Sequence, residues 1–207
     1  ASVGQTVALD GAIQNDFFGD PPIPGAITFG GGGTLTIGNN TNSYSGGTSI
    51  IGNTTVVVGA DGALGAIGTP VTLGDATTGG TLGFTSGTSL STGRTITING
   101  GGGTIDTAGT ADILLSGGMI GAGTLTKTGT GTLTLGSFTS HTGGTTIADG
   151  TLRAGTSGAL GSGAVIIGST GTLDLNNFGQ SIGSLAGAGQ VSLGSATLTT
   201  GSDNTST

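Results

Sequence analysis

The sequence contains no cysteine, no tryptophan and no glutamate, and only 6% of its residues are charged. Without cysteine there are no disulfides, thiolate metal sites or thiol nucleophiles. The only basic residues are Arg94, Lys127 and Arg153, against ten aspartates, which leaves a net charge of −7. Nucleic acids and anionic membrane surfaces are bound by clustered cations. We therefore predict no nucleic acid partner.

Long hydrophobic runs are also absent. The longest runs of valine, isoleucine and leucine hold three residues, at Val56–Val58, Ile113–Leu115 and Val165–Ile167. A transmembrane helix needs about 20 apolar residues, so we expect no direct membrane insertion by this segment. Because no cleavable signal is visible at the start, we expect any targeting segment to lie outside this sequence.

Glycine, threonine and evenly spaced aliphatic residues dominate instead. There are 49 glycines but only four prolines, and the mean hydropathy is +0.28. Low charge with positive mean hydropathy argues against a disordered chain. Short runs with period-two alternation, such as Thr95–Ile98 and Thr132–Leu135, recur between glycines, and no window has a helical apolar stripe. These features predict an all-β protein with frequent turns.

Two parts of the chain resemble each other. Residues 33–65 align with residues 131–161 with only two single-residue gaps. A repeat made of units that cannot close a core alone is typical of a solenoid. We therefore expect a single β-solenoid segment over residues 1–207, with related repeat copies at 31–98 and 128–200.

Four motifs carry a resemblance to a known family: Gly-Gly-Thr-Ile-Asp (102–106), Gly-Ala-Gly-Thr-Leu-Thr-Lys-Thr-Gly (121–129), Thr-Gly-Gly-Thr-Thr (142–146) and Gly-Thr-Leu-Arg-Ala-Gly (150–155). Together they resemble the autotransporter-associated β-strand repeat of Gram-negative secreted passenger domains. One departure is His141, where that family usually has tyrosine, as this chain has at Tyr44. The resemblance implies a right-handed parallel β-helix (β-solenoid) presented or released at the bacterial surface. It implies nothing about enzymatic activity.

The low charge content suits a stacked coil of about eight turns. In such a coil each strand lies about 4.8 Å from its equivalent one turn away. We expect Leu133 and Leu135 to point inward and Thr132 and Thr134 to point outward. Like charges stacked at that spacing would repel by roughly 1 kcal/mol even in water, whereas threonine hydroxyls stack without repulsion.

One segment breaks the pattern. "NDFFGDPPIPG" (15–25) holds two adjacent phenylalanines and three of the four prolines. We interpret residues 11–25 as a loop excursion or part of a cap. The alternative is a partner-contact loop, and its candidate contact residues are Asp16, Phe17, Phe18 and Asp20.

Serine–histidine chemistry is not expected. Ser140 and His141 are adjacent, and neighbours on a strand face opposite sides, so they do not form a hydrolase triad. We interpret His141 as a structural turn residue.

Carboxylate pairs are another candidate catalytic site, because parallel β-helices include polysaccharide lyases and hydrolases. Glycoside cleavage uses two carboxylates about 5–10 Å apart. Asp106 with Asp112, or Asp149 with Asp174, could meet across coils. Aspartates beside glycine or asparagine in turns usually cap their own backbone. We expect no catalytic residues.

Metal and nucleotide sites are not expected either. Asp10, Asp16 and Asp20 with Asn15 could offer oxygens to calcium, but their spacing matches no calcium loop. The glycine-rich stretches 30–35 and 100–105 lack the lysine and the following helix of a phosphate loop. The sequence thus predicts no cofactor and no bound metal.

Thr-x-Thr pairs support one more alternative. They occur at 34/36, 95/97, 124/126, 132/134 and 197/199. Flat ranks of such pairs form the surface of β-solenoid ice-binding proteins. That use requires pairs on one face in successive coils, and here their intervals are irregular.

The sequence favours a non-catalytic structural stalk with an adhesive or self-associating role, within a larger autotransporter-type passenger. We expect it to be secreted or displayed on the surface of a Gram-negative bacterium. Expected partners are host or matrix glycans or proteins, or sister β-helices in a homo-oligomer or filament. The alternatives are an ice-binding protein and a polysaccharide-acting β-helix enzyme.

Overall fold

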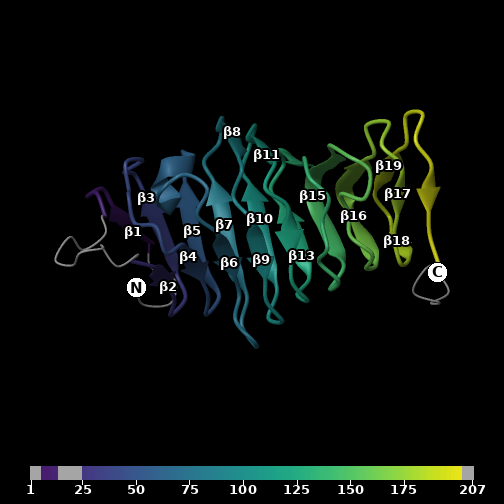
Figure 1. Cartoon of the computed structure of the whole chain (residues 1–207). Helices are drawn as coiled ribbons and strands as arrows, with labels where there is room; N and C mark the ends of the chain where they lie inside the picture. Colours follow the sequence, from purple (N-terminus) through teal and green to yellow (C-terminus); the bar gives the residue numbers. More distant parts are fainter. Residues whose placement is uncertain (1–5, 14–24, 202–207) are drawn as a thin grey trace.

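The strands of the chain lie side by side along one axis, from β1 (Thr6–Leu9) near one end to β19 (Gln190–Ser192) near the other (Figure 1). The structure is a computed structural model that describes residues 6–13 and 25–201. All strand pairs among these residues are parallel, and they stack as a β-solenoid of about 8 turns. The predicted fold class, an all-β parallel β-helix, is confirmed.

Three files of strands run along the solenoid. The first contains β1 (Thr6–Leu9), β3 (Thr34–Ile37), β5 (Thr54–Val58), β7 (Gly80–Phe84), β10 (Gly103–Thr107), β13 (Leu125–Thr128), the start of β15 (Thr145–Ala154), the start of β16 (Val165–Asp174) and β18 (Leu185–Gly187). The second contains β8 (Ser89–Thr92), β11 (Asp112–Leu115), β14 (Thr132–Leu135), the ends of β15 and β16, and β19 (Gln190–Ser192). The third contains β2 (Ile27–Phe29), β4 (Thr48–Ile50), β6 (Val71–Leu73), β9 (Ile96–Ile98) and β12 (Met119–Ile120), and then, as a separate sheet, β17 (Gln180–Ser181) and β20 (Leu198–Thr199).

Coil length varies along the chain. Thr126 pairs with Thr146 in a short coil, whereas Thr55 pairs with Thr81 across a wider sequence interval. The longer coil contains the short 3₁₀ helix η1 (Asp61–Leu64), which contacts β8. The strands nevertheless stay in register, so extra residues are absorbed at the corners.

The core follows the predicted alternation. Leu133 and Leu135 are fully buried, at 0% and 1% exposure, while Thr132 and Thr134 face outward and are half-buried. In the second file, Ile113, Leu133, Leu152 and Leu173 stack in register as an aliphatic column. Complete burial of each such side chain contributes roughly 1.5–3 kcal/mol. The bore of the coil is therefore aliphatic, as expected.

Glycine pairs form two equivalent corners. In the pairs Gly46-Gly47 and Gly143-Gly144, the second residue has a positive φ, 93° for Gly47 and 83° for Gly144. A Cβ at Gly144 would also lie only 2.7 Å from the carbonyl oxygen of Ala164 in the next coil. These corners need glycine both for backbone conformation and for close stacking.

Of residues 11–25, which we interpret as a loop excursion or part of a cap, the structure describes residues 11–13 and 25. Thr6 pairs with Thr34, a wider sequence interval than in the coils that follow, so extra residues are accommodated here. Ile13 donates its N–H to Asn42 Oδ1 at 2.8 Å. Residues 14–24 lie outside the described residues. So do the candidate contact residues Asp16, Phe17, Phe18 and Asp20.

Candidate binding surfaces

A rank of threonines runs along the outer face of the first file. Six half-buried threonines stand in register on successive coils: Thr34, Thr55, Thr81, Thr104, Thr126 and Thr146. Ile166 continues the column. At about 4.8 Å per coil the six hydroxyl-bearing side chains form a straight, uncharged line.

The neighbouring rank on the same face is irregular. Two residues further along each strand, the column contains Val57, Gly83 and Asp106 between Thr36 and Thr128. A double rank of Thr-x-Thr pairs therefore does not form there. The Thr-x-Thr pairs on this face are therefore irregular, as expected from the sequence.

Arg94 occupies the interior at one corner. Its side chain is 0% exposed, and its guanidinium forms an ion pair with Asp61, with Nε 2.7 Å from Oδ1. It also donates to the carbonyl oxygens of Leu64, Gly65, Ala66 and Thr69. One fork-shaped cation thus holds the backbone of the corner from residue 61 to residue 69.

Lys127 also points inward. Its stem stacks in register between the fully buried Ile105 and Ile147. Its Nζ donates to the carbonyl oxygens of Thr128 at 2.7 Å, Gly129 at 2.6 Å and Asp149 at 3.0 Å. Burial lowers the pKa of Lys127 to about 8, against the attraction of nearby Asp149. All three donors are used, so the amine serves the corner structurally.

Tyr44 and His141 form equivalent contacts in the two repeat copies. The Tyr44 hydroxyl lies 2.7 Å from Thr48 Oγ1, and His141 Nε2 lies 3.0 Å from Thr145 Oγ1. Both rings are buried. Each ring lies against a glycine of the next coil, Gly65 or Gly161. His141 is therefore a buried corner residue, and its role is structural, as the sequence predicted.

His141 nevertheless differs from Tyr44 in one respect. Its Nδ1 is buried, and no described residue forms a hydrogen bond with it. Burial lowers the pKa of His141 below its ordinary 6.5, while hydrogen bonding to the Gly144 backbone opposes the shift.

The four candidate carboxylates lie on four different strands. Asp106 lies in the first file and accepts a hydrogen bond from Thr128, while Asp112 lies in the second file. Asp174 pairs with Arg153 at 2.9 Å. Asp149 caps its own corner, where its Oδ1 accepts a hydrogen bond from the Gly150 N–H at 2.9 Å.

Metal-ligand clusters and membrane-spanning helices are absent from residues 6–13 and 25–201. Within these residues no group of three or more His, Cys, Asp or Glu side chains is placed to hold a metal ion. The same residues include no helix long and apolar enough to span a bilayer. Asp10 is described and exposed, whereas its proposed calcium partners Asn15, Asp16 and Asp20 are outside the described part.

A groove opens on the third file, where its sheet is interrupted. The first five strands of this file end at β12, and the file resumes only at β17. A groove of about 750 Å³ extends from this gap over β17 to β20, and twelve residues that include Phe138, Ser162 and Ser181 line it. None of the lining residues is charged.

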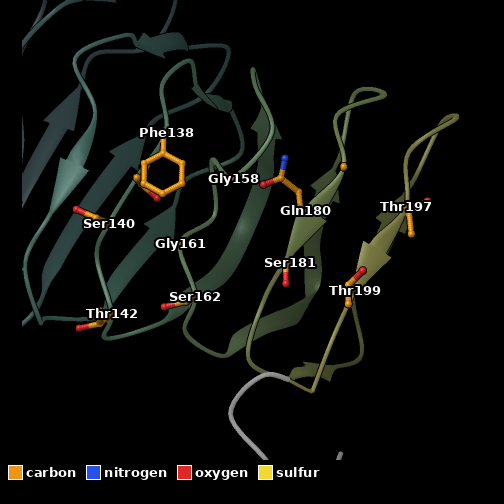
Figure 2. A pocket seen from close by; sticks show the side chains of 12 residues that line it. Phe138, Ser140, Thr142, Gly158, Gly161, Ser162, Gln180, Ser181, Thr197 and Thr199 are labelled. Atoms are coloured by element: carbon orange, nitrogen blue, oxygen red, sulfur yellow. The ribbon is translucent and has the colours of Figure 1, made fainter.

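Figure 2 shows hydroxyl side chains across successive coils of this groove and the ring of Phe138 at one edge. Phe138 is 68% exposed. Its ring rests on Gly158, where a Cβ would lie only 2.8 Å from Phe138 Cδ2. This groove was not predicted from the sequence.

Comparison with known proteins identifies the repeat. A sequence profile of the passenger-associated transport repeat matches residues 30–56 and 125–154. The chain is also 39% identical, over 97% of its own length, to the adhesin BmaC autotransporter of Brucella suis biovar 1 (strain 1330). The chain carries autotransporter passenger repeats. It spans 6% of the length of that relative. No solved structure matches it.

Both matched passenger repeats contain an equivalent corner. The first includes Tyr44 and Thr48, and the second includes His141 and Thr145. The sequence resemblance to passenger repeats is thus confirmed, and it coincides with a repeated set of contacts.

The inward direction of Arg94 and Lys127 was not predicted from the sequence. The signal was present: Arg94 stands two residues before buried Ile96, and Lys127 two residues after buried Leu125. Alternation alone places both side chains inside.

Proposed function

We propose that this chain is a non-catalytic section of a passenger displayed at, or released from, the surface of a Gram-negative bacterium. It acts as a stiff rod with an adhesive surface that contacts glycans, matrix or host proteins, or sister β-helices. The observation that carries this proposal is the 39% identity to an autotransporter adhesin over nearly the whole chain.

The architecture supports a rod with a repeated surface. Backbone ladders connect each coil to the next along the axis, and the threonine rank repeats one side chain on six coils. A single hydroxyl contact is weak, but contacts repeated along a rigid rod add through effective concentration. Adhesion by avidity therefore fits this surface better than capture of one ligand in a deep site.

Bead adhesion tests the proposal. Beads coated with the folded chain are expected to bind epithelial monolayers and extracellular matrix well above beads coated with albumin. The matched control is a Leu133→Asp chain, in which a charge in the aliphatic column disrupts the coil. Equal adhesion of the folded chain and this variant would overturn the proposal. Shortening or desaturation of polysaccharides by the purified chain would overturn its non-catalytic part.

One observation favours the ice-binding alternative, namely the rank of six threonines on one face. The interrupted second rank, with Val57, Gly83 and Asp106, weighs against it. Thermal hysteresis of the purified chain separates the two functions: the adhesive rod gives none, whereas an ice-binding face gives a measurable gap between melting and freezing.

A further inference from the structure

We propose that the groove that runs from residues 138–142 across β17 to β20 is a binding subsite for a neutral glycan chain, with Phe138 as the stacking platform. This inference rests on the proposed adhesive function and names a ligand class and a place for it. The solenoid provides the groove because one face of two coils, at residues 138–142 and 158–162, carries no strand.

The floor of the groove consists of glycine-rich backbone. Gly158 and Gly161 line it and both have positive φ, 71° and 68°. A side chain at Gly158 would collide with Phe138, and one at Gly161 would collide with His141. The recess is therefore fixed by backbone geometry and by the buried ring beneath it.

The aromatic ring is positioned for stacking. Phe138 presents a largely exposed ring, and its contact with Gly158 holds the ring at the edge of the recess. The faces of aromatic rings carry negative charge density and attract the slightly positive C–H groups of a pyranose face. An exposed ring beside an uncharged groove that carries hydroxyl groups is thus suited to a sugar ring.

The hydroxyls of the groove are available to a ligand. Exposed hydroxyl side chains at Ser140, Thr142, Ser162, Ser181 and Thr199 line it on four coils. Within residues 6–13 and 25–201, none of these hydroxyls has a hydrogen-bond partner. They match the hydroxyls of a sugar, since each can donate and accept.

The charge of the site selects a neutral polymer. No lining side chain is charged, and the chain carries a net charge of −7. An anionic polysaccharide would find no cation in the groove and would be repelled by the protein as a whole. A neutral glycan meets no such penalty.

The first repeat copy provides a natural comparison. Asn42 and Thr139 both donate to the equivalent carbonyl oxygens, of Ala63 and Ala159, so Thr41 stands where Phe138 stands in the second copy. The recess there, about 360 Å³, contains Asp61 and no aromatic residue. We assign glycan binding to the second copy alone.

Titration of the ¹⁵N-labelled chain with cellohexaose, laminarihexaose and mannohexaose tests this assignment. We expect at least one of these neutral probes to shift the amides of residues 158–162 and 180–182. Phe138→Ala should weaken that binding about tenfold, and Phe138→Tyr should retain it. Thr41→Ala, at the equivalent place in the first copy, should leave it unchanged.

Three outcomes would overturn the assignment: no shift at the groove with any of the three probes, unchanged binding in Phe138→Ala, or equally tight binding of hexagalacturonate. The two proposals fail separately. Beads that adhere although the groove binds no sugar would remove only the glycan site. Sugar binding without bead adhesion would remove only the adhesive function.

Discussion

At the scale of single residues, backbone carbonyl oxygens of neighbouring corners satisfy the two fully buried cations, Arg94 and Lys127. Lys127 donates to three carbonyl oxygens and Arg94 to five, while His141 leaves Nδ1 without a described partner. A buried polar atom without a partner costs roughly 1–3 kcal/mol. His141 is thus the weakest of these buried corner residues.

His141→Tyr should therefore stabilise the chain, by about 1 kcal/mol at pH 7, because it keeps the contact with Thr145 through a hydroxyl, as Tyr44 does with Thr48, and removes the orphan nitrogen. The gain should grow as the pH falls below 6.5. Burial lowers the pKa of His141, so in that range the unfolded chain takes up a proton that the folded chain does not, and stability is lost. Urea unfolding at pH 7 and pH 5 measures both effects.

Tyr44→His is the reciprocal control. It should destabilise the first corner and add the same loss below pH 6.5. An identical pH dependence in the wild-type chain and in His141→Tyr would contradict this account of the histidine.

At the scale of elements, corners determine how far each coil can depart from a regular length. Arg94 holds the corner that includes η1, in the long coil between Thr55 and Thr81, through Asp61 and several carbonyl oxygens. Arg153 forms a similar ion pair with Asp174 at 2.9 Å, but its side chain is 40% exposed. The two pairs allow burial to be separated from charge.

Arg94→Gln should destabilise the chain by roughly 3–5 kcal/mol, because it leaves Asp61 and buried carbonyl oxygens without their partner. Compared with the wild-type chain, amide hydrogen exchange in Arg94→Gln should accelerate most at residues 61–69. Arg153→Gln, at the exposed pair, should cost no more than about 1 kcal/mol. Equal losses in the two variants would contradict the role assigned to Arg94.

Stacked strands also explain why this chain carries so few charges. Thr104 and Thr126 are register partners on adjacent coils. Thr104→Lys with Thr126→Lys should be less stable than Thr104→Lys with Thr126→Asp by about 1–2 kcal/mol at low salt. The difference should shrink at high salt, because ions screen exposed charges. No difference in urea midpoints at low salt would show that register stacking does not limit charge.

Alternation made much of this architecture predictable. The inward position of Leu133 and Leu135 follows from the period of the strand, and the same rule applied to Arg94 and Lys127 would have placed them inside. The threonine rank was not predictable, because coils of unequal length place its members at irregular sequence intervals. The groove depends on where a sheet stops, which no local pattern around Phe138 encodes.

At the scale of the whole molecule, an uninterrupted first file makes the chain a rod whose surface repeats at a fixed step. Each coil contacts mainly its neighbours, so stability and shape are built step by step along the axis. Such a rod can present the threonine rank on one side and the groove on another. The proposed adhesive function depends on this regular, in-register stacking.

The distance between spin labels at Thr34→Cys and Thr146→Cys tests that stacking most directly, and the absence of native cysteine makes the labelling specific. The two positions stand five register steps apart on one face. Pulsed electron–electron double resonance should give one narrow distribution of label-to-label distances. At about 4.8 Å per step, its centre should lie near roughly 24 Å, before the length of the label linkers is added. A broad distribution, or one centred beyond about 40 Å, would contradict the in-register spacing of the coil.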